Sequence, residues 1–156
     1  MRIEPESPTT PDIAALLAEH LADMRETSPP ESIHALDVDQ LAAPGLVFVS
    51  ARDDKKRLMG IGALARVDDE LGELKSMRTA QEFRGKGVAA AVTSALVQMA
   101  RFRGYKRLSL ETGTHAYFRP AHRLYERLGF EQCEPFGDYV KDPHSRFYTI
   151  ELRRAK

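Results

Sequence analysis

The order in which strand-like and helix-like segments follow one another is the strongest constraint on the fold. Three strand-like segments come first, separated by short charged stretches, at residues 46–51, 57–67 and 71–79. Helix-like and strand-like segments then alternate, at residues 88–104, 106–112, 119–130 and 146–152. Neighbouring strands favour antiparallel pairing, whereas alternation with helices favours parallel pairing. The sequence therefore predicts an α/β fold with a mixed sheet.

The first part of the chain is predicted to be mainly helical. Apolar residues recur there at helical spacing, at Ile13, Leu16, Leu17, Leu21 and Met24. Thr10 and Asp12 are candidate N-caps for this helix. The prolines within residues 28–37 predict a loop that leads into a short helix at residues 38–42. The expected element order is β-α-α-β-β-β-α-β-α-β-β.

Length and composition are typical of an ordinary globular protein. The 156 residues fit a single domain, 1–156. Lysine plus arginine equals aspartate plus glutamate, 23 each, so charge gives no reason to expect a nucleic acid partner. No apolar run approaches the ~20 residues that span a bilayer, and the first ten residues contain no apolar signal core. We therefore expect no membrane partner and a cytoplasmic location.

The cysteine and histidine content argues against a disulfide or a metal site. Cys133 is the single cysteine of the sequence, so no disulfide can form within the chain. The five histidines do not follow a metal-ligand spacing. We expect Cys133 to be a packed strand residue rather than a nucleophile, and we expect no metal cofactor.

The stretch EFRGKGVAAAV, residues 82–92, carries the clearest functional signal. Gly85 and Gly87 lie next to Arg84 and Lys86, directly before a strongly helical segment. The start of a helix presents free N–H groups and a partial positive charge, so each added cation there costs about 0.3–1 kcal/mol. A bound anion reverses that cost. The pattern favours an anion-binding loop; the alternative is a plain loop with solvated cations.

Two known phosphate-binding patterns do not describe this stretch well. A P-loop fails, because Gly87 stands where a hydroxyl residue is required after the lysine. A dinucleotide-binding G-x-G-x-x-A pattern is matched by Gly85, Gly87 and Ala90, and Glu111 follows at about the distance of a ribose-binding acid. That interpretation is disfavoured because residues 80–84 separate the glycines from the preceding strand.

A third pattern, R-x-x-G-x-A, is filled by Arg84, Gly87 and Ala89. Here the sequence resembles the GNAT superfamily of N-acetyltransferases, and in particular its small, single-domain bacterial members. The resemblance implies a mixed sheet of six to seven strands flanked by about four helices. It also implies that acetyl-coenzyme A (acetyl-CoA) binds with its pyrophosphate on Arg84, Gly85, Lys86, Gly87, Val88 and Ala89. The backbone of Met77 and Thr79 would pair with the pantetheine arm.

A second stretch, AHRLYERLGF at residues 121–130, resembles the other signature of the family, A-x-x-L-Y-x-x-x-G-F. The resemblance implies that Tyr125 is the general acid that protonates the leaving thiolate. A phenol with an ordinary pKa near 10 is suited to that transfer. The alternative is a core aromatic residue on the apolar stripe of the helix, and both roles are compatible.

Other site residues follow from the resemblance alone. Glu73 is at the position of the base that removes the amine proton in some members; the alternative is a solvent-facing strand glutamate. His20, Ser32, His34 and Tyr139 lie in segments that usually shape the acceptor pocket, and each has surface polarity or a local turn bond as its alternative. Phe118 stands where many members have an asparagine, so that contact is absent or supplied by His115 or Arg119.

Together these features predict an acetyl-CoA-dependent N-acetyltransferase. A neutral primary amine, on a small molecule or a peptide, would attack the thioester directly in a ternary complex. The rival interpretation is a non-catalytic module that binds acyl-CoA. The resemblance leaves a homodimer open.

Overall fold

A computed structural model describes residues 1–33 and 36–152. Its strands form one seven-stranded sheet in the order β1-β2-β3-β4-β5-β7-β6, with β4 and β5 parallel and the other neighbours antiparallel. The strands are β1 (Arg2–Pro5), β2 (Val47–Arg52), β3 (Leu58–Arg66), β4 (Leu71–Thr79), β5 (Arg107–Gly113), β6 (Glu131–Cys133) and β7 (Ser145–Glu151). The mixed sheet and the predicted order of elements are confirmed, and Cys133 is a strand residue as expected.

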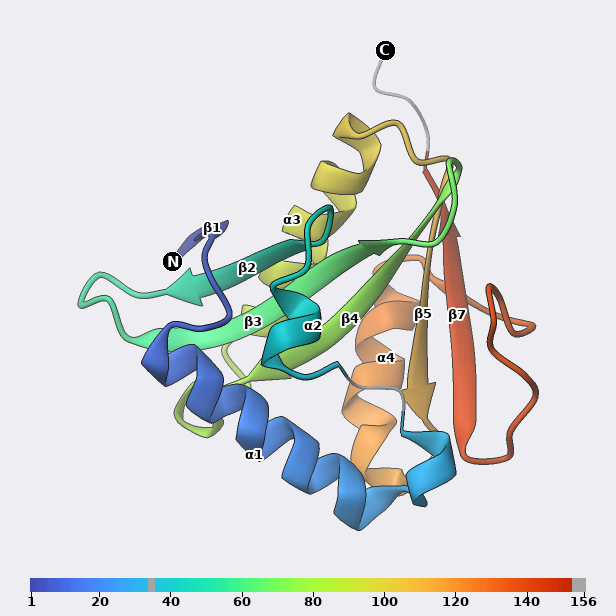
Figure 1. Cartoon of the computed structure of the whole chain (residues 1–156), viewed down its shortest axis with the longest axis horizontal. Helices are drawn as coiled ribbons and strands as arrows, with labels where there is room; N and C mark the ends of the chain where they lie inside the picture. The colour runs from blue at the N-terminus through green and yellow to red at the C-terminus, as the bar shows by residue number, and fades with distance from the viewer. Residues whose placement is uncertain (34–35, 153–156) are drawn as a thin grey trace.

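Helices cover both faces of this sheet. The α-helices are α1 (Pro11–Thr27), α2 (Val38–Leu41), α3 (Val88–Phe102) and α4 (Arg119–Arg127), and short 3-10 turns lie at η1 (Pro30–Ser32), η2 (Gln81–Phe83) and η3 (Ala116–Phe118). In Figure 1, α1 and α2 lie in front of the sheet, and α3 and α4 lie behind it. Among the described residues, no helix is long and apolar enough to cross a membrane.

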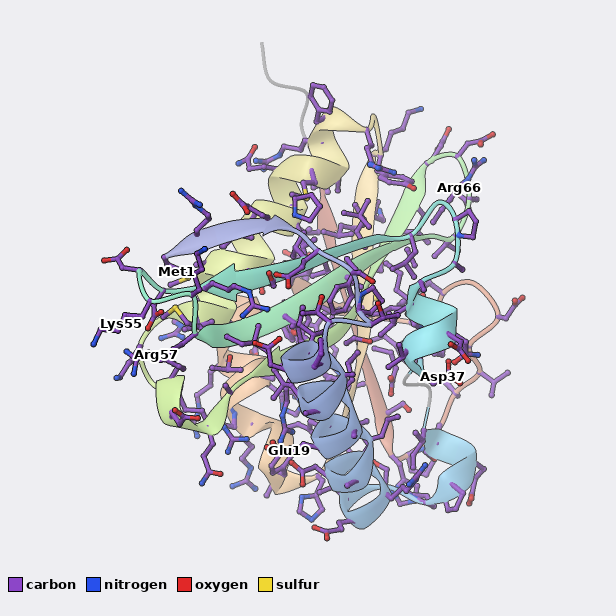
Figure 2. All side chains as sticks on the ribbon, turned by 60° about the vertical axis from the view of Figure 1, so that its left-hand side comes forward. Met1, Glu19, Asp37, Lys55, Arg57 and Arg66 are labelled. Carbon is purple, nitrogen blue, oxygen red and sulfur yellow. The ribbon has the colours of Figure 1, made fainter. Side chains whose placement is uncertain are left out.

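Local sequence explains where α1 and α2 begin. Pro11 occupies the first turn of α1, where its fixed φ is favourable and its missing N–H costs nothing. Thr10 is the N-cap residue as predicted, but its hydroxyl donates to the Ser7 carbonyl at 2.9 Å instead of capping the helix. The Asp37 side chain, labelled in Figure 2, caps α2 by accepting from the Gln40 N–H at 2.8 Å.

Apolar faces of α1 and α3 pack on opposite sides of the sheet. Ile13 and Leu17 of α1 are buried against the sheet in one apolar cluster. Val92 and Leu96 of α3 belong to a larger cluster on the other side. A Cβ on Gly62 of β3 would lie 2.8 Å from the Val92 side chain, so glycine is needed there for α3 to approach the sheet.

The sheet opens between β4 and β5. Their parallel pairing runs only from Leu71↔Arg107 to Leu74↔Leu110. Beyond it β4 contains a bulge, because the pairing with β3 shifts across Gly62 and Ser76 has a φ of 56°. The ends of β4 and β5 then diverge, as Figure 1 shows. The rest of β4, residues 75–79, has no described strand partner on its β5 side.

Candidate active site

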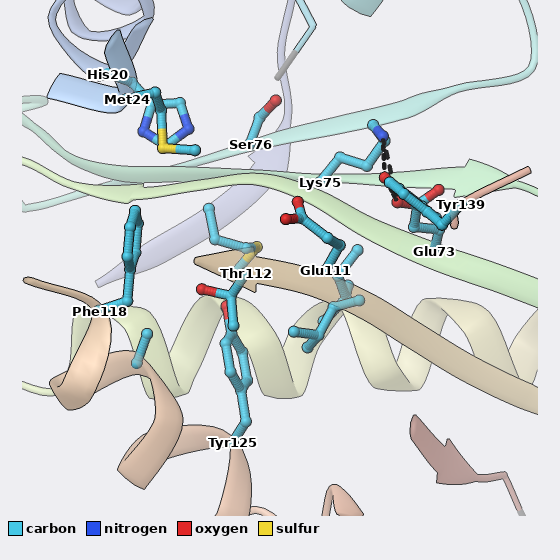
Figure 3. A pocket seen from close by; sticks show the side chains of 14 residues that line it. His20, Met24, Glu73, Lys75, Ser76, Glu111, Thr112, Phe118, Tyr125 and Tyr139 are labelled. Carbon is cyan, nitrogen blue, oxygen red and sulfur yellow. Dashed lines mark hydrogen bonds and ion pairs between the residues drawn. The ribbon is translucent and has the colours of Figure 1, made fainter. Parts of the chain in front are cut away.

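A cavity of about 110 Å³ lies where β4 and β5 diverge. Its walls come from five parts of the chain, α1, β4, β5, the η3–α4 segment and the loop between β6 and β7. Figure 3 shows the Tyr125 side chain extending from α4 toward the cavity, with Glu73, Lys75 and Tyr139 grouped at the other end. Three residues predicted from the sequence to form the acceptor and base side, His20, Glu73 and Tyr139, line the same cavity as Tyr125.

Tyr125 is both a packed core residue and a residue of the cavity wall, as the sequence allowed. Its ring is 6% exposed and packs edge-on against Phe130, with the ring centroids 5.7 Å apart. The residue also lines the cavity. Burial raises the pKa of Tyr125 well above its usual range, so its hydroxyl keeps its proton at neutral pH. A packed ring with a hydroxyl that keeps its proton fits a positioned proton donor, but the raised pKa makes Tyr125 a weaker acid than the ordinary phenol that the sequence led us to expect.

Glu73 is only 7% exposed, which excludes the alternative of a solvent-facing glutamate. One of its carboxylate oxygens, Oε2, accepts from the Tyr139 hydroxyl at 2.5 Å and from Lys75 Nζ at 3.2 Å. Lys75 Nζ also donates to the Tyr139 hydroxyl oxygen at 3.0 Å. Burial and the nearby Glu73 charge raise the pKa of Tyr139 above its usual range. The three side chains are therefore hydrogen-bonded to one another in a single cluster.

Glu111 is a cavity residue that the sequence did not identify for this chemistry. It follows Leu110, the last residue of β5 that pairs with β4, and it is half-buried. Burial raises the pKa of Glu111 to about 7. The Ser145 hydroxyl and the Lys75 ammonium oppose this rise, whereas the Glu73 carboxylate adds to it. Glu111 thus exchanges its proton near neutral pH, although the sequence had suggested only a disfavoured ribose contact for it.

His20 of α1 contributes a neutral imidazole to the cavity wall. Burial and the nearby Arg78 guanidinium lower the pKa of His20 to about 4. At neutral pH the ring is uncharged, and its conjugate acid is too strong for it to hold a proton taken from an amine. His20 is therefore suited to contact an acceptor by hydrogen bonding rather than to act as a base.

Ser32 and His34 were the other predicted pocket residues. Ser32 does not line the cavity; its buried hydroxyl donates to the Asp142 carboxylate, which joins the segment after α1 to the loop before β7. His34 lies outside the described residues. Contact of either residue with an acceptor stays a prediction.

Arg78 holds α1 over the opening, a role that gave no signal in the sequence. Its side chain is 5% exposed and pairs with Glu19 at 2.8 Å and with Asp23, both on α1. It also donates to the Tyr117 hydroxyl of η3 at 2.9 Å. The Arg78 guanidinium lowers the pKa of Asp23, so the carboxylate stays charged. One buried arginine on β4 therefore connects α1 and η3.

The glycine loop has the geometry of an open anion site. Gly85 and Gly87 have φ values of 75° and 81°, in the left-handed region that favours glycine, and Gly87 is the N-cap residue of α3. A Cβ on either glycine would meet nothing within 4 Å, so the space above the loop is open. Within the described chain, the N–H groups of residues 85–90 find no backbone acceptor. Arg84 and Lys86 are exposed beside them.

The described residues therefore fit the phosphates of a coenzyme at this loop, through free N–H groups and two cations. The unpaired side of β4 at Met77 and Thr79 offers backbone groups to an extended ligand. No group of three or more His, Cys, Asp or Glu side chains suited to a metal ion occurs in the described ranges.

Phe118, which stands where the resemblance led us to expect an asparagine, is a wall of the cavity. It is 9% exposed, and a Cβ on Gly113 would lie 2.3 Å from its ring, so the ring covers the end of β5. His115 accepts the Tyr117 N–H through Nδ1 at 3.0 Å, and neither His115 nor Arg119 lines the cavity. An apolar ring thus occupies the place of the amide.

Comparisons with known proteins show the family to which the chain belongs. Residues 13–130 match the model of the acetyltransferase (GNAT) family. Over 150 residues the chain is 49% identical to YedL of Escherichia coli, named an N-acetyltransferase, and the match covers 96% of this chain and 94% of YedL.

Solved structures share the fold. A Klebsiella pneumoniae protein assigned as an acyl-CoA N-acyltransferase superposes with a TM-score of 0.79 at 28% identity, over 97% of each chain. A GNAT acetyltransferase from Elizabethkingia anophelis, solved with acetyl-CoA bound, superposes with a TM-score of 0.68 at 19% identity, again over 97% of each chain. The chain belongs to the GNAT family of acetyltransferases, and it is an N-acetyltransferase.

Proposed function

We propose that this protein transfers the acetyl group of acetyl-CoA to the primary amine of an acceptor, by direct attack in a ternary complex. The observation that carries the proposal is the cavity at the opening of the sheet. The protonated Tyr125 of α4 and the carboxylates Glu73 and Glu111 of the sheet all line this cavity. The acetyl-CoA bound to the Elizabethkingia relative supports the same co-substrate here.

We assign coenzyme binding to the residues that the sequence predicted for it. Residues 84–89 hold the pyrophosphate through free backbone N–H groups and the side chains of Arg84 and Lys86. The backbone of Met77 and Thr79 pairs with the pantetheine arm, as an added strand would. N–H groups of β4 near the bulge at Ser76 polarise the acetyl carbonyl. Bound in this way, the coenzyme supplies a thioester to the cavity.

The acceptor enters on the face that carries α1. His20 and Tyr139 line this side, and the small cavity suits the amino end of an acceptor better than a bulky group. The amine reacts as the neutral base. Its proton passes to a carboxylate on this face, directly or through water; the sequence pointed to Glu73, which lies there. Tyr125 supplies a proton to the departing sulfur from the opposite side.

An acceptor screen tests the proposal. The protein is incubated with acetyl-CoA and a panel of small amines, amino acids, aminoglycosides and peptides. Free thiol and acetylated product are then measured together, by a colorimetric assay and by mass spectrometry. We expect amine-dependent thiol release matched by an acetylated amine. Tight coenzyme binding without thiol release for any amine would instead support the non-catalytic acyl-CoA-binding module.

A further inference from the structure

We propose that Glu111 accepts the proton of the acceptor amine, and that the neighbouring Glu73–Tyr139–Lys75 cluster stays a fixed hydrogen-bonded network during the transfer. The inference rests on the proposed function and assigns a catalytic residue within it. In the transfer, the amine nitrogen bonds to the acetyl carbon while the carbon–sulfur bond breaks. The N–H proton goes to Glu111, and the Tyr125 O–H proton goes to sulfur, so protons balance.

The bonds around Glu73 leave its Oε2 atom poorly placed to take a further proton. Its Oε2 already accepts from the Tyr139 hydroxyl at 2.5 Å and from Lys75 Nζ at 3.2 Å. A proton arriving at that oxygen would have to displace one of these donors, which are themselves bonded to each other. Breaking a buried, connected network leaves unsatisfied polar groups, each costing about 1–3 kcal/mol. The Oε2 atom of Glu73 is thus already occupied by two donors.

Glu111 has the opposite environment. It is the first residue of β5 beyond the pairing with β4, and its side chain reaches into the opening, as Figure 3 shows. None of the ion pairs within residues 1–33 and 36–152 involves it. Burial without an ion-pair partner raises the pKa of its carboxyl group to about 7. A base with a pKa near the working pH is both ionised often enough and strong enough to take a proton.

The other titratable groups of the cavity do not compete for this role. His20 on α1 has a pKa of about 4, and Tyr125 and Tyr139 keep their protons. Lys75 is a donor in the cluster around Glu73.

The charged or titratable groups that face Glu111 are Glu73 and Lys75 on β4, Tyr139 and Asp142 in the loop before β7, His20 on α1 and Tyr125 on α4. Of these, the Glu73 and Asp142 charges raise the pKa of Glu111, and the Lys75 charge lowers it.

The test compares Glu111→Gln with Glu73→Gln in kcat/KM–pH profiles, using one acceptor from the screen. Because all proteins use the same acceptor, its own titration cancels in the ratio to wild type. We expect Glu111→Gln to lose roughly 10²–10⁴-fold at the pH optimum. The kcat/KM of wild type divided by that of Glu111→Gln should rise with pH and level off above about pH 7. Glu73→Gln should keep the rise of kcat/KM with pH but show it at lower pH, because a negative charge near Glu111 is gone.

A measurement without acceptor separates this inference from the proposed function. Carbon-13 NMR of glutamate-labelled protein should contain one carboxyl signal that titrates near pH 7, absent in Glu111→Gln and shifted to lower pH in Glu73→Gln. An acetyl-CoA thermal shift checks that each variant is folded. The assignment would be overturned by a Glu111→Gln variant with a near-wild-type rate. It would also be overturned if the rise of kcat/KM with pH were lost only in Glu73→Gln. Failure of wild-type protein to acetylate any amine would refute the proposed function itself.

Discussion

The two sides of the β4–β5 opening are built in different ways. On the coenzyme side, the groups on offer are backbone N–H and C=O groups, in the glycine loop and along the unpaired part of β4. Residues 84–87 of the glycine loop are exposed, and open space lies above Gly85 and Gly87, whereas residues 75–79 of β4 are buried or half-buried. On the acceptor side, the groups are buried or half-buried side chains from α1, β4, β5 and the loop before β7. One side is therefore fixed by local backbone geometry, and the other by tertiary packing.

The first way to test this division is the substitution Tyr125→Phe, which carries the largest expected effect. It removes the hydroxyl and keeps the ring that packs on Phe130. We expect a single-turnover rate about 10²–10⁴-fold lower at saturating acetyl-CoA, with melting temperature and coenzyme affinity close to wild type. A chemical step at the wild-type rate would remove Tyr125 from the mechanism. Loss of stability with an intact rate per folded molecule would make it a purely structural residue.

Coenzyme binding should stabilise the fold by linkage. At a free acetyl-CoA concentration of 100 times Kd, the gain is about 2.7 kcal/mol. For a chain of this size that corresponds to a rise of about 5–10 °C in Tm, measured by scanning calorimetry. NAD at the same concentration should give little change. A shift with NAD and none with acetyl-CoA would revive the dinucleotide-binding interpretation.

The glycine loop can be tested with a matched pair, Gly87→Ala and Gly87→Asp. Both place a side chain on a residue whose φ is 81°, which costs about 1–2 kcal/mol of stability in either variant. Only the aspartate adds a negative charge where we expect the diphosphate. Calorimetry should therefore find coenzyme affinity weaker in the Asp variant than in the Ala variant by about tenfold, or ~1.4 kcal/mol. Equal affinities in the two variants would argue against an anion at this helix start.

The smallest effect concerns stability on the acceptor side. The folded protein raises the pKa of Glu111 from 4.5 to about 7, so between these values it retains a proton that the unfolded chain releases. Stability from this group is present below pH 4.5 and is lost as pH rises to about 7. Glu111→Gln should remove this loss and be more stable than wild type at pH 8, by on the order of 1 kcal/mol after discounting for partial exposure.

Urea titrations of both proteins at pH 4 and pH 8 measure this difference. If the difference in free energy of unfolding between pH 4 and pH 8 is the same in Glu111→Gln as in wild type, Glu111 is not desolvated in the folded state.

The sequence predicted those parts of the fold that depend on local chemistry. The bounds of β4, Leu71–Thr79, agree with the predicted segment, because its flanking turns are strongly marked. The helix start after Gly87 was readable for the same reason, since a left-handed φ at glycine is a property of a few residues.

The acceptor side could not be predicted in the same detail. The place of Glu111 depends on where β4 stops pairing with β5, and that depends on a bulge at Ser76, whose residue type gives no signal for φ > 0. The bond of Tyr139 to Glu73 joins positions 66 residues apart. The family resemblance selected Tyr139 as a candidate but did not indicate its partner, because such contacts follow from register and loop packing.

The most direct test of the division between the two sides is a crystal structure with coenzyme A bound. We expect pyrophosphate oxygens within about 2.7–3.2 Å of backbone nitrogens in residues 85–90. The pantetheine arm should lie along residues 75–79 of β4, and the sulfur should face Tyr125. Glu73 and Glu111 should make no contact with the coenzyme and remain open to the α1 side. A coenzyme that lies on the α1 side, or that contacts the carboxylates and leaves the glycine loop empty, would contradict this division between a coenzyme side and an acceptor side.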